Sequence, residues 1–181
     1  MLKRISRRAT KRRLRRRIGA AVSVGLMGAA VLMAASAAPA YATTDYITTY
    51  SGFCLTDGGS TTNSAPITQY MCNGNTKAQT WDIIGNSNGT NKLENTTNDM
   101  CMTNGGSTAN SAKITQYKCN GSANQSWYEV TAGTGSYVLF ESDSVPSKCM
   151  TNGGSTTNST PITQYNCGNF TDRNMWFVGH G

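Results

Sequence analysis

Six cysteines are the residues whose spacing says most about chemistry. They fall into three pairs, and the two members of each pair are 18 residues apart. An even number of cysteines in an exported chain is typical of disulfides, and the repeated spacing favours one bridge within each pair. A zinc site is disfavoured, because the chain has no CxxC pair and one histidine, His180. The predicted bridges are Cys54–Cys72, Cys101–Cys119 and Cys149–Cys167.

Catalytic groups are poorly represented. A serine nucleophile needs a histidine base with a neighbour that orients it, and His180 lies at the end of the sequence. Glycoside hydrolysis needs two facing carboxylates. The acidic residues outside the repeated segments do not recur from copy to copy: Asp45, Asp82, Glu94, Asp99, Glu129, Glu141, Asp143 and Asp172. The sequence therefore predicts a protein that is not an enzyme and that uses no cofactor or metal.

The chain contains a threefold internal repeat. Segments of 19 residues begin at Cys54, Cys101 and Cys149, and 13 positions are identical in all three. Identity at this level exceeds what a shared composition could give, so the chain is a threefold duplication. Three tryptophans follow the segments at matching distances: Trp81, Trp127 and Trp176. We expect these tryptophans in the core, where each supplies a large buried area.

Each repeat is predicted to contain four short strands. In the first copy they are Tyr46–Tyr50, Phe53–Thr56, Ile67–Cys72 and Gln79–Ile84. The loop between the second and third is rich in Gly and Asn, which adopt positive φ readily and suit turns. Short strands at even spacing, without a sustained 3.6-residue period, predict an all-β fold. The runs that open the other copies are Lys92–Asn95 and Tyr137–Glu141.

Residues 1–42 are predicted to be a secretory signal peptide. A basic run, Lys3–Arg17, precedes the apolar stretch Ile18–Ala38, and Ala40-Tyr41-Ala42 offers a small-x-small cleavage site. Cleavage leaves residues 43–181 as a secreted, extracellular domain with no membrane segment. The alternative is a membrane anchor, because the apolar stretch is long enough to span marginally. Paired arginines leave twin-arginine export open beside the general secretory route.

The charge and the apolar content of residues 43–181 narrow the function further. The formal net charge of the chain is +7, but ten of its sixteen Lys and Arg residues lie in the basic run. From Thr43 onward, six basic and nine acidic residues give 6 − 9 = −3, which argues against nucleic-acid binding. Only 17 of these 139 residues are large aliphatics or Phe. The disulfides must therefore help to stabilise a small core, at roughly 3 kcal/mol each.

Three copies of about 47 residues that open with C-L/M-T and close with a Gln-x-Trp-like element resemble the ricin-type lectin domain. The closing elements are Gln79-Thr80-Trp81, Gln125-Ser126-Trp127 and Asn174-Met175-Trp176. The resemblance implies a β-trefoil of twelve strands with pseudo-threefold symmetry, in which a six-strand barrel is capped by three hairpins. The repeats would be about 44–88, 89–134 and 135–181.

The resemblance also implies one shallow sugar site per repeat. Its carboxylate position, just after the first cysteine, falls on Thr56 or Asp57, and we favour Asp57, with Asn104 and Asn152 as counterparts. The stacking aromatics would be Tyr70, Tyr117 and Tyr165. Strand alternation places Thr68, Thr115 and Thr163 on the same face, unless the register slips and the neighbouring glutamines serve. Among the closing residues, Asn124 and Gln125 match the family pattern, whereas Ala78 and Arg173 replace the asparagine in the other copies.

These features predict a secreted, non-catalytic carbohydrate-binding protein with up to three unequal sites that act together on a polysaccharide or glycan. We expect the first and second copies to be similar in affinity and the third to be weakest. The expected partners are sugars or polysaccharide and a separately encoded secreted enzyme, and no nucleic acid or membrane. The alternative is an extracellular trefoil that binds or inhibits a protein, which would present one non-symmetric set of exposed apolar residues.

Overall fold

The computed structural model describes residues 42–180, apart from residues 75, 132–134, 169–170 and 172. The predicted signal peptide, up to residue 41, lies outside the described residues. The described part has no α-helix, and its two short 3-10 helices could not cross a membrane. Its elements are β1 (Ala42–Thr49), β2 (Phe53–Thr56), β3 (Thr68–Met71), η1 (Lys77–Gln79), β4 (Thr80–Gly85), β5 (Asn91–Asn95), β6 (Met100–Thr103), β7 (Thr115–Lys118), η2 (Ala123–Gln125), β8 (Ser126–Thr131), β9 (Tyr137–Ser142), β10 (Lys148–Thr151), β11 (Thr160–Pro161), β12 (Thr163–Asn166) and β13 (Trp176–His180).

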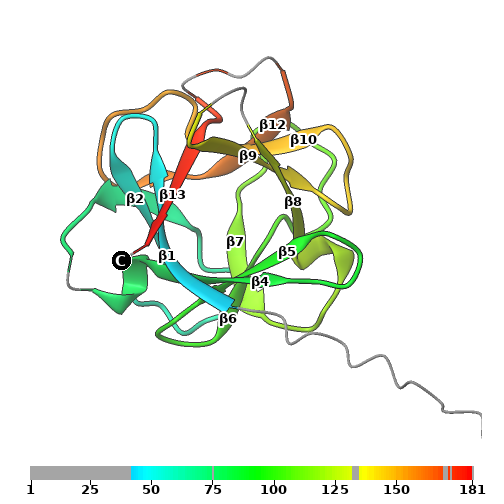
Figure 1. Ribbon diagram of the computed structural model, residues 1–181, viewed down its shortest axis with the longest axis horizontal. Coiled ribbons are helices and arrows are strands. Elements are labelled where there is room, and N and C mark those ends of the chain that lie inside the picture. Colours follow the sequence, from blue (N-terminus) through cyan, green and yellow to red (C-terminus); the bar gives the residue numbers. More distant parts are fainter. Residues whose placement is uncertain (1–41, 75, 132–134, 169–170, 172, 181) are drawn as a thin grey trace, which may run out of the picture. The chain divides into compact units, whose positions relative to one another are not determined.

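Six strands close into a barrel. Strand β1 pairs with β4, β4 with β5, β5 with β8, β8 with β9, β9 with β13, and β13 with β1, all antiparallel. Figure 1 looks into this ring. Closure removes the unpaired edges that a sheet would otherwise expose.

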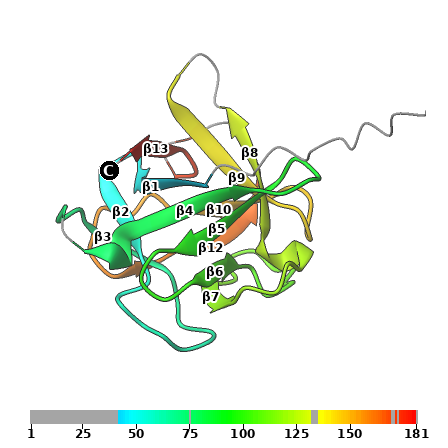
Figure 2. The same ribbon diagram turned by 60° about the horizontal axis from the view of Figure 1, so that its bottom comes forward.

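Three hairpins, β2–β3, β6–β7 and β10–β12, complete the fold. Figure 2 shows one of them, β6–β7, below the barrel strands β4 and β5. Each repeat thus supplies two barrel strands and one hairpin, which confirms the predicted all-β trefoil. The one addition is β11, a two-residue strand that pairs with β3 and joins the third repeat to the first.

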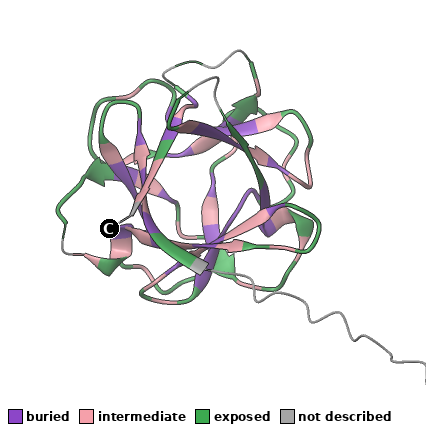
Figure 3. Ribbon diagram, viewed as in Figure 1, coloured by how far each residue is buried: buried purple, intermediate pink, exposed green. Residues whose placement is uncertain are grey.

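The core is small and built from equivalent residues of the three repeats. Each repeat contributes a tryptophan from the strand that follows its 3-10 turn or closing loop, together with three more fully buried apolar side chains. Figure 3 shows buried segments along the barrel and exposed loops around it. The fully buried set is Trp81, Trp127, Trp176, Leu55, Met102, Met150, Ile67, Ile114, Ile162, Ile47, Leu93 and Phe140. The prediction that the tryptophans lie in the core is confirmed.

A cyclic set of hydrogen bonds joins the repeats. The backbone N–H of Ile67 donates to the carbonyl of Ile114, Ile114 to Ile162, and Ile162 back to Ile67, at 2.9–3.0 Å. Beside each isoleucine a fully buried glutamine reaches into the Gly-rich loop of the preceding repeat. Gln116 Nε2, for example, donates to the carbonyls of Ser60 and Thr62. The loops therefore hold the repeats together. They also bring the backbone of one repeat against the second hairpin strand of the next, as where the Ser64 N–H donates to the Gln116 carbonyl.

The three disulfides join Cys54 to Cys72, Cys101 to Cys119 and Cys149 to Cys167. Each bridge links the first strand of a hairpin to the residue just beyond its second strand, so that every repeat is cross-linked within itself. The predicted pairing is confirmed.

Candidate functional site

The tyrosine strands present one face to solvent and one to the interior. Tyr70, Tyr117 and Tyr165 are 41–52% exposed, and the threonines two positions earlier are half-buried beside them. The intervening glutamines are fully buried and bind the neighbouring loops. The register therefore places Thr68, Thr115 and Thr163 beside the tyrosines, as strand alternation predicts, and places Gln69, Gln116 and Gln164 on the opposite face.

In the second repeat these residues line a hollow of about 360 Å³. Tyr117 and Thr115 form one side, and the closing residues Asn124 and Gln125 form the other. Asn124 lies against the Gly-rich turn: a Cβ on Gly106 would come within 3.2 Å of its Oδ1 atom. A glycine, which is also at positive φ here, is required for this approach. We call this the second-repeat hollow.

In the third repeat the corresponding hollow is larger, at about 560 Å³. Tyr165 and Thr163 again form one side, and Arg173 and Asn174 replace the closing pair. The Arg173 side chain lies over the turn, because a Cβ on Gly154 would come within 3.2 Å of its Cγ and Nε atoms. We call this the third-repeat hollow.

The first repeat lacks the side chain that walls the other two. Ala78 stands where they have Asn124 and Arg173. Its backbone carbonyl still accepts from the N–H of Asp57 at 3.3 Å, so the loop is held in the same way. A Cβ on Gly59 would meet no described atom within 4 Å. Tyr70 is thus presented on a more open surface.

The residues expected at the carboxylate position point inward. Asp57, Asn104 and Asn152 are 3–4% exposed. Each accepts from the N–H of the second glycine through one oxygen, and each has a further side-chain partner. That partner is the half-buried Asn98 for Asp57, and the buried Ser142 and Gln69 for Asn104 and Asn152. None of the three lines the second-repeat or third-repeat hollow. Their side chains stabilise the loop from below.

The neighbouring threonines lie on the strand face that carries the tyrosines, although they are themselves 5–8% exposed. Thr103 lines the second-repeat hollow and Thr151 the third, directly across the hairpin from Thr115 and Thr163. The sequence offered Thr56, the first-repeat equivalent, as an alternative to Asp57. The signal that decides between them is alternation from the cysteine: Cys54 pairs with Tyr70, so Thr56 shares the face of that tyrosine and Thr68.

Two serines were missed from the sequence. Ser64 lines the second-repeat hollow and Ser111 the third, and both come from the loop of the preceding repeat. Both have positive φ, 65° and 62°, which is uncommon outside Gly and Asn. Each hollow is therefore shared between two repeats, a property that no reading of a single repeat could reveal.

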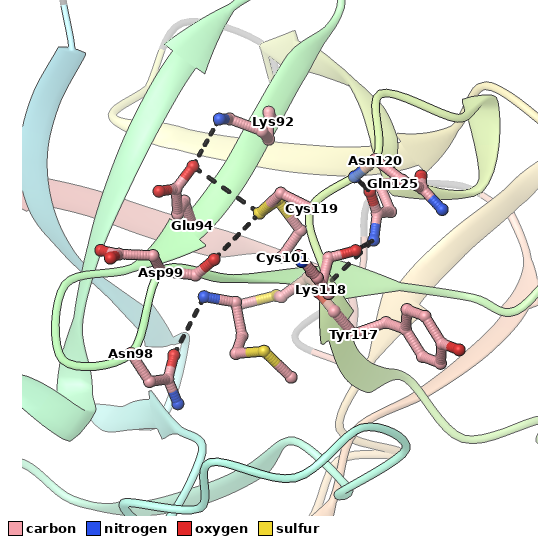
Figure 4. The surroundings of a disulfide bond; sticks show 12 residues. Lys92, Glu94, Asn98, Asp99, Cys101, Tyr117, Lys118, Cys119, Asn120 and Gln125 are labelled. Carbon is pink, nitrogen blue, oxygen red and sulfur yellow. Dashed lines mark hydrogen bonds and ion pairs between the residues drawn. A yellow bond between two sulfur atoms is a disulfide. The ribbon is translucent and has the colours of Figure 1, made fainter.

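The closing glutamines, Gln79 and Gln125, mainly stabilise the fold. Gln125 Nε2 donates to the Lys118 carbonyl at 3.0 Å, and its Oε1 accepts from the N–H of Asn120 at 2.8 Å (Figure 4). Gln79 makes the equivalent bonds to Met71 and Asn73. Gln125 still forms part of the wall of its hollow, but both ends of its amide are engaged.

Burial raises the pKa of the Asp57 carboxyl, although hydrogen bonds from the Gly59 N–H and Asn98 oppose the rise. Burial also raises the pKa of Glu129, with a smaller contribution from Asp45. Neither carboxyl lines the second-repeat or third-repeat hollow. These shifts therefore bear on stability and not on the chemistry of the hollows.

Glu94 lies beside the Cys101–Cys119 bridge, with its Oε2 3.7 Å from Cys119 Sγ (Figure 4). The three residues are close enough to suggest metal ligands. Both cysteines are, however, joined to each other and offer no thiolate. Glu94 pairs with Lys92 instead. Figure 4 shows the Tyr117 ring pointing away from this ion pair, on the other side of the bridge.

The hollows combine an exposed aromatic ring with hydroxyl and amide groups in a shallow surface. Such a surface can stack on an apolar ring face and exchange hydrogen bonds with hydroxyl groups. Its lining holds no pair of facing carboxylates and no histidine among the described residues. The arrangement suits recognition.

The ricin-type beta-trefoil lectin domain family matches residues 43–176 of this chain. No curated protein matches. Among solved structures, the designed threefold-symmetric protein ThreeFoil has a TM-score of 0.71 and 23% identity over 76% of this chain and 99% of its own. The Macrolepiota procera ricin B-like lectin, solved with lactose, has a TM-score of 0.65 and 14% identity over 81% and 99%. An exo-beta-1,3-galactanase from Clostridium thermocellum, 1,3Gal43A, has a TM-score of 0.70 and 23% identity. That match covers 77% of this chain but only 30% of the galactanase.

Proposed function

Because the chain belongs to the ricin-type β-trefoil lectin family, we propose that it is a secreted, non-catalytic carbohydrate-binding protein whose sugar sites are the second-repeat and third-repeat hollows. The first repeat contributes a weaker, more open site around Tyr70, because it lacks the side chain that walls the other two hollows, and this ranking replaces the sequence-based expectation that the third copy is weakest. The sites are shallow, so useful affinity comes from several of them engaging one polysaccharide or glycan.

One observation carries this proposal. In two repeats the fold brings an exposed tyrosine, a pair of facing threonines and an amide or guanidinium group around one hollow. In the second repeat these are Tyr117, Thr103 with Thr115, and Asn124. A sugar ring has an apolar face for the tyrosine and hydroxyl groups for the others. Thr103 Oγ1 accepts from the Gly105 N–H, which leaves its own hydrogen to donate to a ligand.

Export supports the same role. Cleavage after Ala42 would leave β1 nearly whole, because the strand begins at that residue. Three disulfides suit an oxidising compartment. Intact-mass measurement of the protein from culture fluid should show a start at Thr43, and recovery of uncleaved protein in a membrane fraction would argue for the anchor instead.

A glycan array probed with the purified, oxidised protein tests the binding claim and identifies the sugar. Against a polysaccharide that binds, Tyr117→Ala and Tyr165→Ala should each weaken binding, and their combination should weaken it far more. Phe177 is an exposed aromatic residue outside both hollows, so Phe177→Ser is the matched control. If the tyrosine variants bind like the parent protein, these side chains are ordinary surface residues and the hollows are not the sites.

A second candidate is a protein-binding module, and one asymmetric feature favours it. Tyr50, Tyr137 and Phe177 form an aromatic cluster. The ring centroids of Tyr50 and Tyr137 are 5.4 Å apart, and those of Tyr137 and Phe177 are 6.2 Å apart. The register gives Tyr50 the polar counterparts Thr96 and Asp143 in the other repeats. A partner protein, such as a separately encoded secreted enzyme, would dock on this cluster. Phe177→Ser would then abolish co-purification of the partner and leave glycan binding intact.

A further inference from the structure

We propose that the third-repeat hollow binds a sugar that carries a carboxylate, and that Arg173 is the residue which sets this preference. The inference rests on the proposed carbohydrate-binding function and adds a ligand class for one of its sites. In the second repeat Asn124 holds the same position and favours a neutral sugar.

The two positions are equivalent in the backbone. The Arg173 carbonyl accepts from the N–H of Asn152 at 3.0 Å, and the Asn124 carbonyl accepts from Asn104 at 3.1 Å. Both side chains then lie across the second glycine of the turn, with the closest approach 3.2 Å from a Cβ built there. The change from amide to guanidinium is therefore made at one fixed place in the wall of the hollow.

Contact with the turn positions the arginine. Its Cγ and Nε atoms lie over Gly154, while the residue as a whole stays exposed and lines the hollow with Tyr165. A side chain that rests on the backbone loses less conformational freedom when it binds a ligand. The guanidinium is planar and presents paired N–H donors that match the two oxygens of a carboxylate.

The surroundings favour an anion. No described carboxylate lines the third-repeat hollow. A second cation is close: Lys148 Nζ donates to the side chains of Asn110 and Asn166, and Asn166 forms part of the lining. The ion pair found among the described residues is Lys92–Glu94, which belongs to the second repeat. Arg173 thus gives the hollow a positive wall that the second-repeat hollow does not have.

Galactose and galacturonic acid are matched probes, because they differ at C6, where one has a hydroxymethyl group and the other a carboxylate. Titration of the isotope-labelled, disulfide-bonded protein, followed by backbone NMR, reads the two hollows separately through Thr115–Lys118 and Thr163–Asn166. At low salt we expect the third-repeat hollow to bind galacturonate up to about fivefold more tightly than galactose, the most that an exposed ion pair typically contributes. The second-repeat hollow should show no such preference, and 0.5 M salt should reduce it.

Reciprocal variants test the residue. Arg173→Asn should remove the preference for galacturonate over galactose, and Asn124→Arg should transfer that preference to the second-repeat hollow. Asp172, the preceding residue, lies outside the described residues, and with Asp172→Asn the preference should be at least as large. Acetate at equal concentration should shift the third-repeat resonances far less than galacturonate, because it lacks the sugar ring.

The outcomes separate the two proposals. If galactose and galacturonate bind the third-repeat hollow equally, or if Arg173→Asn keeps the preference, the assignment to Arg173 is overturned while the carbohydrate-binding function stands. Equal shifts with acetate would also overturn it, by showing a simple anion site. If neither sugar shifts the resonances of either hollow, this inference fails, and the glycan array decides separately whether the proposed function stands.

Discussion

The interior and the exposed faces of the three repeats obey the threefold symmetry to different degrees. Inside, Gln69, Gln116 and Gln164 are all fully buried, and each donates to two carbonyls of a neighbouring repeat's loop. Outside, the closing position is Ala78 in the first copy, whereas Asn124 and Arg173 wall the hollows of the second and third. The buried glutamine of each hairpin thus repeats in all three copies, whereas the closing position beside each hairpin varies.

The difference follows from what each face must satisfy. A buried amide needs all of its partners, so a change there leaves polar groups without hydrogen bonds. An exposed side chain can be exchanged at little cost, because water replaces the lost partner. Symmetry inside therefore maintains the trefoil, while asymmetry outside would let the proposed sites differ in specificity. The predictions below challenge each half of that comparison.

Loss of a disulfide should have the largest effect. Replacing Cys101 and Cys119 together by serine should lower the free energy of unfolding by about 2–5 kcal/mol, because a closed loop in a protein with a small core is released. Urea unfolding measures it. The same double change at Cys54 and Cys72 should lower stability by a similar amount, since the loops have equal length. A large inequality would break the symmetry of the interior.

The buried glutamine should come next. Gln116→Leu removes the side-chain donor of the Thr62 carbonyl and leaves the Ser60 carbonyl with Asn98 alone. We expect a loss of about 1–3 kcal/mol, again by urea unfolding. Thr115→Val, one residue earlier on the exposed face, is the control, with an expected change within about 0.5 kcal/mol. Equal losses in the two variants would contradict the assignment of the faces.

A smaller effect is expected from completing the first repeat. Ala78→Asn should place an amide over Gly59, as Asn124 lies over Gly106. One added hydrogen bond contributes about 0.5–1.5 kcal/mol, so galactose should bind the first repeat roughly two- to tenfold more tightly. NMR titration through the Thr68–Met71 resonances measures this. Ala78→Val, which adds bulk without a hydrogen-bonding group, should give no gain, and a gain with valine would point to packing alone.

The smallest effect concerns the one copy with an acid beneath its loop. Burial raises the pKa of Asp57 above its ordinary value of 3.8, so the folded protein holds this proton more tightly than the unfolded chain. The resulting stability is present below that ordinary value and is lost as the pH rises through the raised pKa. Asp57→Asn should flatten this part of the pH dependence of unfolding. Glu129→Gln, which removes the other raised carboxyl, should flatten it separately, and an unchanged slope in both variants would rule out these two groups as its source.

Much of this fold could be predicted because the same cysteine, glycine and tryptophan spacing recurs in three copies. The disulfide pairs, the strands around Phe53 and the buried tryptophans follow from spacing and alternation alone. The candidate site was harder. Asp57 has the right type for a sugar ligand, but its direction depends on a single step of register, and the inward direction is stabilised by Asn98, which lies 41 residues away in sequence. Ser64 and Ser111 were out of reach, because they enter hollows belonging to the next repeat.

Mapping galactose onto the protein by backbone NMR tests the central claim most directly. If the second-repeat and third-repeat hollows are the sugar sites, the amides that shift should cluster in two sets among the described residues, with saturable titration curves. The first set is Ser64 with residues 103–125 other than Ser111, and the second is Ser111 with residues 151–174. Tyr117→Ala should abolish the shifts in the first cluster and leave the second. Shifts confined instead to the surroundings of Tyr50, Tyr137 and Phe177, or the absence of any shift with the full range of glycans that the array identifies, would contradict the account.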